Sequence, residues 1–113
     1  MDPKPARDRL RALHREGTFV IPNPFDRGST RLLESLGAVA LATTSAGLAN
    51  SRGLTDMGID RATLLTHVAD LAPAVGVPLH VDAERCFADD PAGVAETVHR
   101  LAGTGAAGLS IED

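Results

Sequence analysis

Two carboxylates, Asp82 and Glu84, come at the end of a short, mostly apolar run, residues 78–81. In an extended strand, side chains at positions i and i+2 point to the same face, so these two acids would project together where the strand ends. Carboxylate oxygens suit Mg²⁺ or Mn²⁺, which keeps several waters and leaves positions for substrate oxygens. The pattern predicts a metal site. The alternative is that the two acids only mark the start of a solvated loop.

Composition excludes several classes of protein. The chain has 113 residues, a net charge of −4, three Phe and no Trp or Tyr, so it lacks the aromatic platforms and positive charge that nucleic acids require. The single cysteine, Cys86, cannot form an internal disulfide. Residues 1–16 lack the apolar centre of a signal peptide, and no apolar run is long enough to cross a bilayer. We therefore expect a soluble, cytoplasmic protein that binds neither nucleic acid nor membrane.

Apolar periodicity and turn residues divide the chain into alternating elements. Helices are expected at 6–15, 29–36, 60–75 and 89–102, with Ser29, Asp60 and Asp90 as N-cap residues. Short buried strands are expected at 19–22, 38–44, 78–84 and 106–111. Residues 45–59 contain several glycines and no helical period, so they predict a long, mobile loop that could act as a lid.

This alternation of strand and helix predicts βα units with a parallel sheet. In such sheets functional side chains gather at the carboxyl ends of the strands. The last predicted strand also ends on acids, Glu112 and Asp113. Asp82, Glu84 and Glu112 are therefore expected to lie close together at one end of the sheet.

Four segments, taken in order, resemble the isocitrate lyase/phosphoenolpyruvate mutase family, and in particular its carboxyphosphonoenolpyruvate mutase and methylisocitrate lyase-like members. They are Val20-Ile21-Pro22-Asn23-Pro24, Leu41-Ala42-Thr43-Thr44-Ser45-Ala46-Gly47, Val81-Asp82-Ala83-Glu84 and Gly108-Leu109-Ser110-Ile111-Glu112-Asp113. The resemblance implies a (β/α)₈ barrel of the TIM type. It also implies a Mg²⁺-dependent lyase or phosphonomutase that makes or breaks a C–C or P–C bond through the enolate of pyruvate, with a 2-oxo acid, a phosphonate or a phosphate ester as substrate.

The resemblance also implies roles for individual residues. Asp82 corresponds to the acid that binds the metal, and Glu84 and Glu112 correspond to acids that hold its waters. The turn of Ser45, Ala46 and Gly47 corresponds to the segment that contacts the substrate carboxylate. Asp56 corresponds to an acid of the gating loop, which we take as the candidate catalytic residue.

Two features depart from the family pattern. Arg85 and Cys86 stand where the family usually has Asn-Gly, a difference that matters if position 86 needs a positive φ. In addition, a full barrel typically has ~250 residues. We therefore expect residues 1–113 to form one partial barrel, truncated after the fourth strand, that associates into an oligomer. The alternative function is a catalytically inactive half-barrel that works, if at all, by pairing with another copy or with a complementary half.

Overall fold

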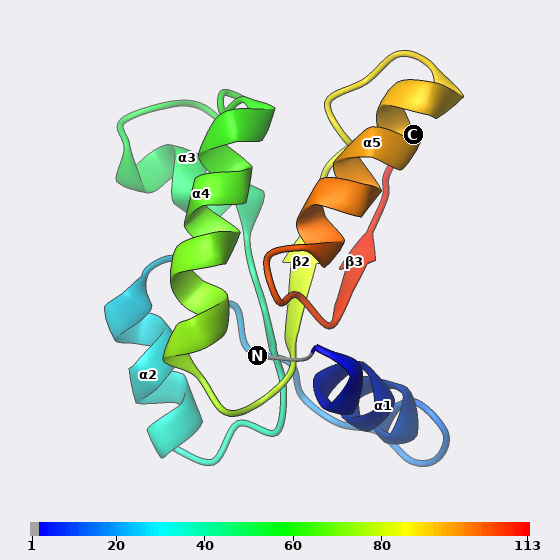
Figure 1. The fold of residues 1–113 in the computed structure, drawn as a ribbon. Helices are drawn as coiled ribbons and strands as arrows, with labels where there is room; N and C mark the ends of the chain where they lie inside the picture. The colour runs from blue at the N-terminus through cyan, green and yellow to red at the C-terminus, as the bar shows by residue number, and fades with distance from the viewer. Residues whose placement is uncertain (1–2) are drawn as a thin grey trace.

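In the computed structural model, which describes residues 3–113, helices pack against a small parallel sheet (Figure 1). The strands β1 (Leu41–Ala42), β2 (Leu79–Asp82) and β3 (Gly108–Ser110) lie in the order β1-β2-β3 and are all parallel. Between and before them come α1 (Lys4–Leu13), α2 (Arg27–Ser35), α3 (Ser45–Ser51), α4 (Arg61–Leu71), the 3₁₀ turn η1 (Ala72–Ala74) and α5 (Pro91–Ala102). This is the predicted arrangement of parallel βα units.

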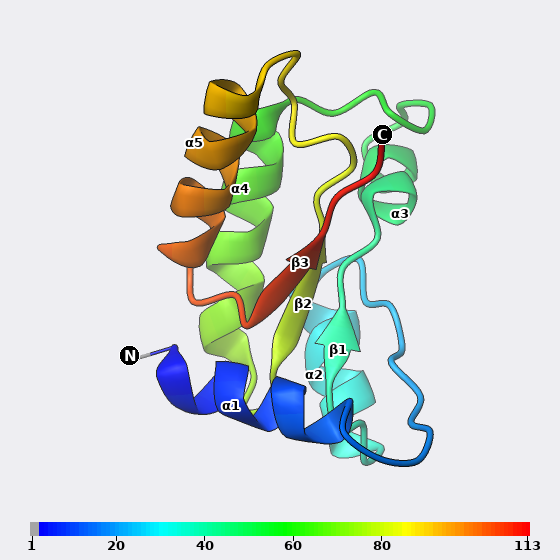
Figure 2. The ribbon, with the colours of Figure 1, turned by 90° about the vertical axis from the view of Figure 1, so that its right-hand side faces the viewer.

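The elements take distinct positions around the sheet (Figure 2). The helices α4 and α5 lie side by side along one face of the sheet, while α1 crosses the end at which the strands begin. The helix α3 and the C-terminus lie at the opposite end, where the strands finish. Among residues 3–113, no helix has the length and apolar character needed to cross a bilayer.

Helix starts follow the N-cap chemistry of the sequence. Asp60 and Asp90 cap α4 and α5 as predicted, each accepting a hydrogen bond from a backbone N–H three residues later. The cap of α2 is Asp26, so the prediction of Ser29 is wrong. Ser29 is instead the third helical residue of a capping box, in which its N–H donates to the carboxylate of Asp26.

The core forms where α4 and α5 pack on the strands. Leu64, Val68 and Leu71 of α4 are buried, and so is Leu101 of α5. The strand β2 alternates between two environments: Leu79 and Val81 are buried, whereas His80 and Asp82 are half-buried. This alternation places His80 and Asp82 together on the second face of the sheet, as the period of a strand requires.

The predicted strand at 19–22 is not a regular strand, although the Ala42 N–H donates a 3.1 Å hydrogen bond to the Pro22 carbonyl. The next bond of a parallel ladder would come from the N–H of residue 24, but residue 24 is proline and has no N–H. The side-chain Nδ2 of Asn23 donates to the Ala42 carbonyl instead, at 3.2 Å. The segment therefore lies beside β1, but proline prevents a full ladder of backbone hydrogen bonds between them.

The prediction of a continuous loop at 45–59 is wrong in its first half, because residues Ser45–Ser51 form α3. The Oγ1 of Thr44 accepts a 3.1 Å hydrogen bond from the Gly47 N–H and so caps the helix. Leu48 and Ala49 are then buried in the core. Burial against the rest of the protein therefore stabilises a helix in a segment whose sequence has no helical period. The loop that follows is limited to residues 52–60.

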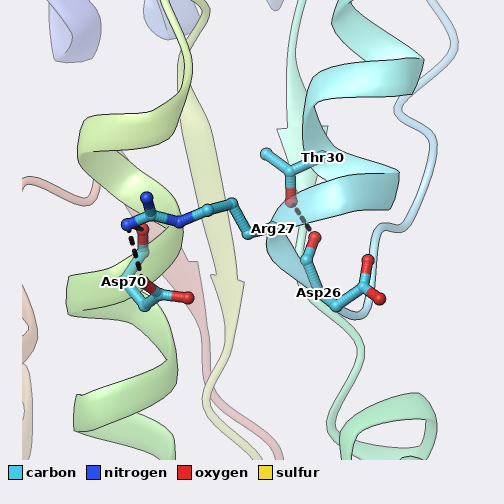
Figure 3. A network of polar contacts seen from close by, with 4 residues as sticks. All are labelled: Asp26, Arg27, Thr30 and Asp70. Atoms are coloured by element: carbon cyan, nitrogen blue, oxygen red, sulfur yellow. Dashed lines mark hydrogen bonds and ion pairs between the residues drawn. The ribbon is translucent and has the colours of Figure 1, made fainter.

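Polar contacts join α2 to α4 (Figure 3). Arg27 at the start of α2 donates to a carboxylate oxygen of Asp70 at 2.7 Å and to its backbone carbonyl at 3.3 Å. The hydroxyl of Thr30, a buried residue, donates to the Asp26 carbonyl at 2.6 Å within the first turn of α2. The ion pair of Arg27 with Asp70 therefore links α2 to α4, while the Thr30 hydrogen bond holds the first turn of α2 itself.

Candidate functional site

The ends of β1 and β2 are joined through the carboxylate of Asp82. Oδ2 of Asp82 accepts a 2.7 Å hydrogen bond from the Ser45 hydroxyl and a 3.1 Å bond from the Ser45 N–H. The Asp82 N–H in turn donates to Oγ1 of Thr43 at 3.0 Å. Thr43 has no role in the sequence-based prediction, although its position at the end of a buried strand is a signal that could have identified it. Asp82 is therefore held in a fixed orientation.

Glu84 lies near Asp82, but not for the reason that the strand pattern suggests. The strand ends at Asp82, and Glu84 has a φ of 50°, in the left-handed region that non-glycine residues rarely adopt. The alternation of a strand therefore does not place its side chain, and that part of the prediction is wrong. A turn brings the two residues together, and the Glu84 N–H donates to Oδ1 of Asp82 at 3.2 Å.

The carboxylate of Glu84 is buried without a complete set of partners. The residue is 2% exposed, and its Oε2 atom has no hydrogen-bond partner among residues 3–113. Burial raises the pKa of Glu84, and the negative charges of Asp82, Asp56 and Glu112 raise it further, against the opposing effect of Arg85. An unpartnered buried carboxylate beside other acids is a group that a cation would stabilise.

The two other predicted acids are also at this end of the sheet. The Glu112 N–H donates a 2.7 Å hydrogen bond to the Glu84 carbonyl, so the chain after β3 runs beside the turn after β2. Asp56 lies in the 52–60 loop, exposed, and accepts a 2.9 Å hydrogen bond from the Met57 N–H. Because both acids act on the pKa of Glu84, the four acids share one electrostatic environment.

The chemistry of the candidate ligands suits a hard cation, although their side chains do not form a closed metal site. Within the described part of the chain, no group of three or more His, Cys, Asp or Glu side chains is arranged to hold a metal ion. The chemistry nevertheless fits Mg²⁺, since all the candidate ligands are carboxylates and one oxygen, Oε2 of Glu84, is buried and unpartnered. Asp82, Glu84 and Glu112 are therefore the residues that would hold it.

The predicted carboxylate-binding turn is the first turn of α3. The N–H of Ser45 donates to Asp82 and that of Gly47 donates to Thr44. The N–H of Ala46 has no hydrogen-bond partner within residues 3–113. Glycine is needed at position 47, because a Cβ there would lie 2.6 Å from Cγ2 of Thr44. The turn thus packs tightly against its own cap.

The turn after β2 shows the consequence of having Arg85 and Cys86 in place of Asn-Gly. Cys86 has a φ of 61° and Phe87 a φ of 54°, so position 86 does adopt the conformation that favours glycine. Cys86 is fully buried, and burial raises the pKa of its thiol, which disfavours the thiolate that a nucleophile needs. Arg85 pairs with Asp89, which directs its guanidinium to that exposed acid.

Comparisons with known proteins agree with this architecture. The model of the phosphoenolpyruvate phosphomutase family matches residues 10–113. The 2-methylisocitrate lyase of Escherichia coli (strain K12) is 34% identical over 104 residues, which cover 90% of this chain and 35% of the relative. A structure described as a "putative lyase/mutase" from Burkholderia cenocepacia J2315 has a TM-score of 0.97 and 49% identity, over 100% of this chain and 41% of that one.

A second solved structure gives the same result. The phosphoenolpyruvate phosphomutase from Streptomyces platensis subsp. rosaceus has a TM-score of 0.85 and 31% identity, over 96% of this chain and 38% of that one. The chain thus spans well under half the length of these relatives, and the fold is the predicted first half of a TIM-type barrel. Since the family model matches nearly the whole chain, the protein belongs to the phosphoenolpyruvate phosphomutase family, in the phosphoenolpyruvate mutase/isocitrate lyase superfamily.

Proposed function

We propose that the protein supplies the metal- and carboxylate-binding half of a lyase or phosphonomutase that acts on a 2-oxo acid, or a phosphonate or phosphate ester related to one, through the enolate of pyruvate. The observation that carries the proposal is the buried, unpartnered Oε2 of Glu84 beside the fixed carboxylate of Asp82. Both lie at the carboxyl end of a parallel sheet, which is where such folds place their chemistry.

The roles of the residues follow from their positions. Asp82, Glu84 and Glu112 would hold Mg²⁺ or Mn²⁺, which acts when bound as a Lewis acid toward a substrate oxygen that gains negative charge. Ser45, Ala46 and Gly47 would bind the substrate carboxylate, with the free N–H of Ala46 as one donor.

Asp56 is the candidate catalytic acid or base. It is exposed in the 52–60 loop and close enough to Glu84 to raise the pKa of that carboxyl. Closure of this loop over the strand ends would exclude water from a reactive enolate.

Metal binding gives a direct test that does not require turnover. Millimolar Mg²⁺ should raise the melting temperature of the wild type, because a ligand that binds only the folded state stabilises it. Asp82→Asn should abolish the rise and Glu84→Gln should weaken it. Glu16→Gln removes an exposed acid remote from the site and should respond to Mg²⁺ as the wild type does. Isothermal titration calorimetry on the same four proteins measures the binding directly.

The second candidate is a catalytically inactive half-barrel. Among the described residues the acids are not arranged to hold a metal ion, and this favours the second candidate. In that case the melting temperature of the wild type would not change with millimolar Mg²⁺ and would equal that of Asp82→Asn. That result would exclude the proposed metal-dependent function for this chain.

A further inference from the structure

The turn after β2, residues 83–87, contains several residues in the left-handed conformation. Glu84, Cys86 and Phe87 have φ values of 50°, 61° and 54°, and none of them is glycine. A side chain in this region of φ costs free energy, so the conformation persists only where surrounding contacts hold it. The turn includes Glu84, the buried carboxylate of the proposed metal site. The contacts that hold the turn therefore determine where this carboxylate lies.

Backbone hydrogen bonds hold the first half of the turn. The Ala83 N–H donates to the Ser110 carbonyl at 3.2 Å, and the Glu112 N–H donates to the Glu84 carbonyl at 2.7 Å. The Cys86 N–H donates back to the Ala83 carbonyl at 2.8 Å and closes the turn on itself. These bonds come from the chain at the end of β3 and from the turn, and they leave the Cys86 carbonyl to be held by another group.

A buried threonine of α5 holds the second half of the turn. The hydroxyl of Thr97 donates to the Cys86 carbonyl at 2.7 Å, and Thr97 is fully buried. Within residues 3–113, that carbonyl accepts no other hydrogen bond. The hydroxyl also lies 3.2 Å from the Gly93 carbonyl, one turn earlier in α5, which is a common local contact of threonine in a helix. Since a hydroxyl has one proton, the shorter distance assigns that proton to Cys86.

The start of α5 is fixed against the same connection between β2 and α5, which is drawn in yellow in Figure 1. A Cβ at Gly93 would lie 2.7 Å from Cβ of Ala88 and 2.9 Å from Oδ1 of Asp90, so glycine allows the connection to lie directly against the first turn of the helix. Asp90 also caps α5 by accepting from the Gly93 N–H at 2.6 Å. The helix is therefore a fixed support from which Thr97 reaches the turn.

Removal of the Thr97 hydroxyl would act on Glu84 and not on Asp82. It would leave a buried carbonyl without a partner, and such a carbonyl costs more free energy than the hydrogen bond itself contributes. The turn would then relax toward ordinary φ values, which would carry Glu84 away from its place. Asp82 would keep its orientation, because Ser45 and Thr43 hold it through separate hydrogen bonds.

We propose that Thr97 is a positioning residue of the metal site: its hydroxyl holds the turn after β2 in the left-handed form that keeps the Glu84 carboxylate beside Asp82. The effect on the metal rests on the proposed function, whereas the hold on the turn does not. Residues that orient metal ligands change metal affinity by about 10- to 100-fold when they are replaced, so the inference has a measurable consequence.

Titration of the full chain with Mn²⁺, followed by electron paramagnetic resonance, measures the effect on the metal. Thr97→Val keeps the shape of the side chain and should raise the Mn²⁺ dissociation constant by about tenfold or more, whereas Thr97→Ser keeps the hydroxyl and should bind as the wild type does. Thr30→Val removes another fully buried hydroxyl, which donates to the Asp26 carbonyl at 2.6 Å, and should leave the constant unchanged. In a Glu84→Gln background, Thr97→Val should add little, because it acts through Glu84.

Alkylation of Cys86 by iodoacetamide measures the hold on the turn without any metal. Cys86 is the single cysteine of the chain and is fully buried, so its reaction reports opening of the turn. Thr97→Val should react about tenfold or more faster than its global stability in urea predicts, since the bond to the turn is lost. Thr97→Ser and Thr30→Val should react at the rates that their global stabilities predict. If Thr97→Val does not fold, Thr97→Ala, which also lacks the hydroxyl and favours a helix, takes its place.

The two measurements separate failure of the inference from failure of the proposed function. A wild type that binds Mn²⁺ with the same affinity as Thr97→Val overturns the inference and leaves the proposed function intact. A wild type that binds no Mn²⁺ overturns the proposed function, together with the effect on the metal, and alkylation then decides the hold on the turn. Alkylation of Thr97→Val at the rate that its global stability predicts overturns that hold, and so does a Thr97→Ser variant that reacts as fast as Thr97→Val.

Discussion

Ser45 and Asp82 form the contact that joins the ends of β1 and β2, with the Ser45 hydroxyl 2.7 Å from Oδ2 of the carboxylate. The two residues are 37 positions apart in the chain, and both have roles in the proposed site. The contact therefore ties the proposed metal ligand to the proposed carboxylate-binding turn, so that the two parts of the site hold one another in place.

Replacing Ser45 by alanine should test the strength of this contact. A hydrogen bond to a charged group contributes about 1.5–3 kcal/mol, and the backbone N–H bond of Ser45 remains in the variant. We expect a loss of about 1–2 kcal/mol in the free energy of unfolding, measured by urea denaturation. Ser51→Ala, at the end of the same helix, removes a hydroxyl that donates only to the Leu48 carbonyl and should cost less. Equal losses in the two variants would contradict the assigned role.

Replacing Gly47 by alanine should destabilise the first turn of α3. The new Cβ would lie 2.6 Å from Cγ2 of Thr44, so the cap must shift, at a cost of about 1–3 kcal/mol. Gly28→Ala is a matched control, because Gly28 lies inside α2 with its nearest neighbour at 3.7 Å. Alanine there should stabilise the protein by up to about 1 kcal/mol. If both variants had the same melting temperature, the close packing at Thr44 would be refuted.

His67 should make stability depend on pH. It is 7% exposed on α4, and its Nε2 has no hydrogen-bond partner in the described part of the chain. Burial lowers the pKa of His67 from its ordinary value of 6.5, with a further lowering by Arg52, against Asp70 and Asp26. Below that ordinary value the unfolded chain binds a proton that the folded chain does not, so the free energy of unfolding falls as pH drops through 6.5 toward the lowered pKa.

Urea denaturation at about pH 7 and about pH 5 measures this effect. His67→Gln should lose less stability over that interval than the wild type. His99→Gln, which changes an exposed histidine of α5, should follow the wild type. An unchanged pH dependence in His67→Gln would show that other groups dominate the titration.

Limited proteolysis should distinguish α3 from the loop that follows it. Arg52 is exposed directly after α3, whereas Arg61 begins α4 and is half-buried. Exposed loops open locally at low cost, so trypsin should cut after Arg52 before it cuts after Arg61. Mass spectrometry identifies the first fragments, and Arg52→Gln should slow cleavage of this region. Earlier cleavage at Arg61 would contradict the assignment of 52–60 as the mobile part.

Local chemistry in the sequence was enough to predict the alternation of elements and much of the site. Asp60 and Asp90 could be identified as caps because a cap depends only on residues within one turn. The spacing of βα units predicted the parallel sheet, and the position of Asp82 at the end of an apolar run predicted its place at the end of β2. The ordered segments that resemble the family predicted the family that the comparisons then showed.

Contacts between distant residues determined the rest. The sequence around Ser45 lacks a helical period, and α3 forms because Leu48 and Ala49 are buried by the core. The position of Glu84 depends on a left-handed turn rather than on strand alternation. The segment at 19–22 lacks a full ladder because Pro22 and Pro24, which have no N–H, fall at positions that face β1. Local propensity and periodicity describe neighbours along the chain, whereas burial and long-range hydrogen bonds are decided only when the whole chain folds.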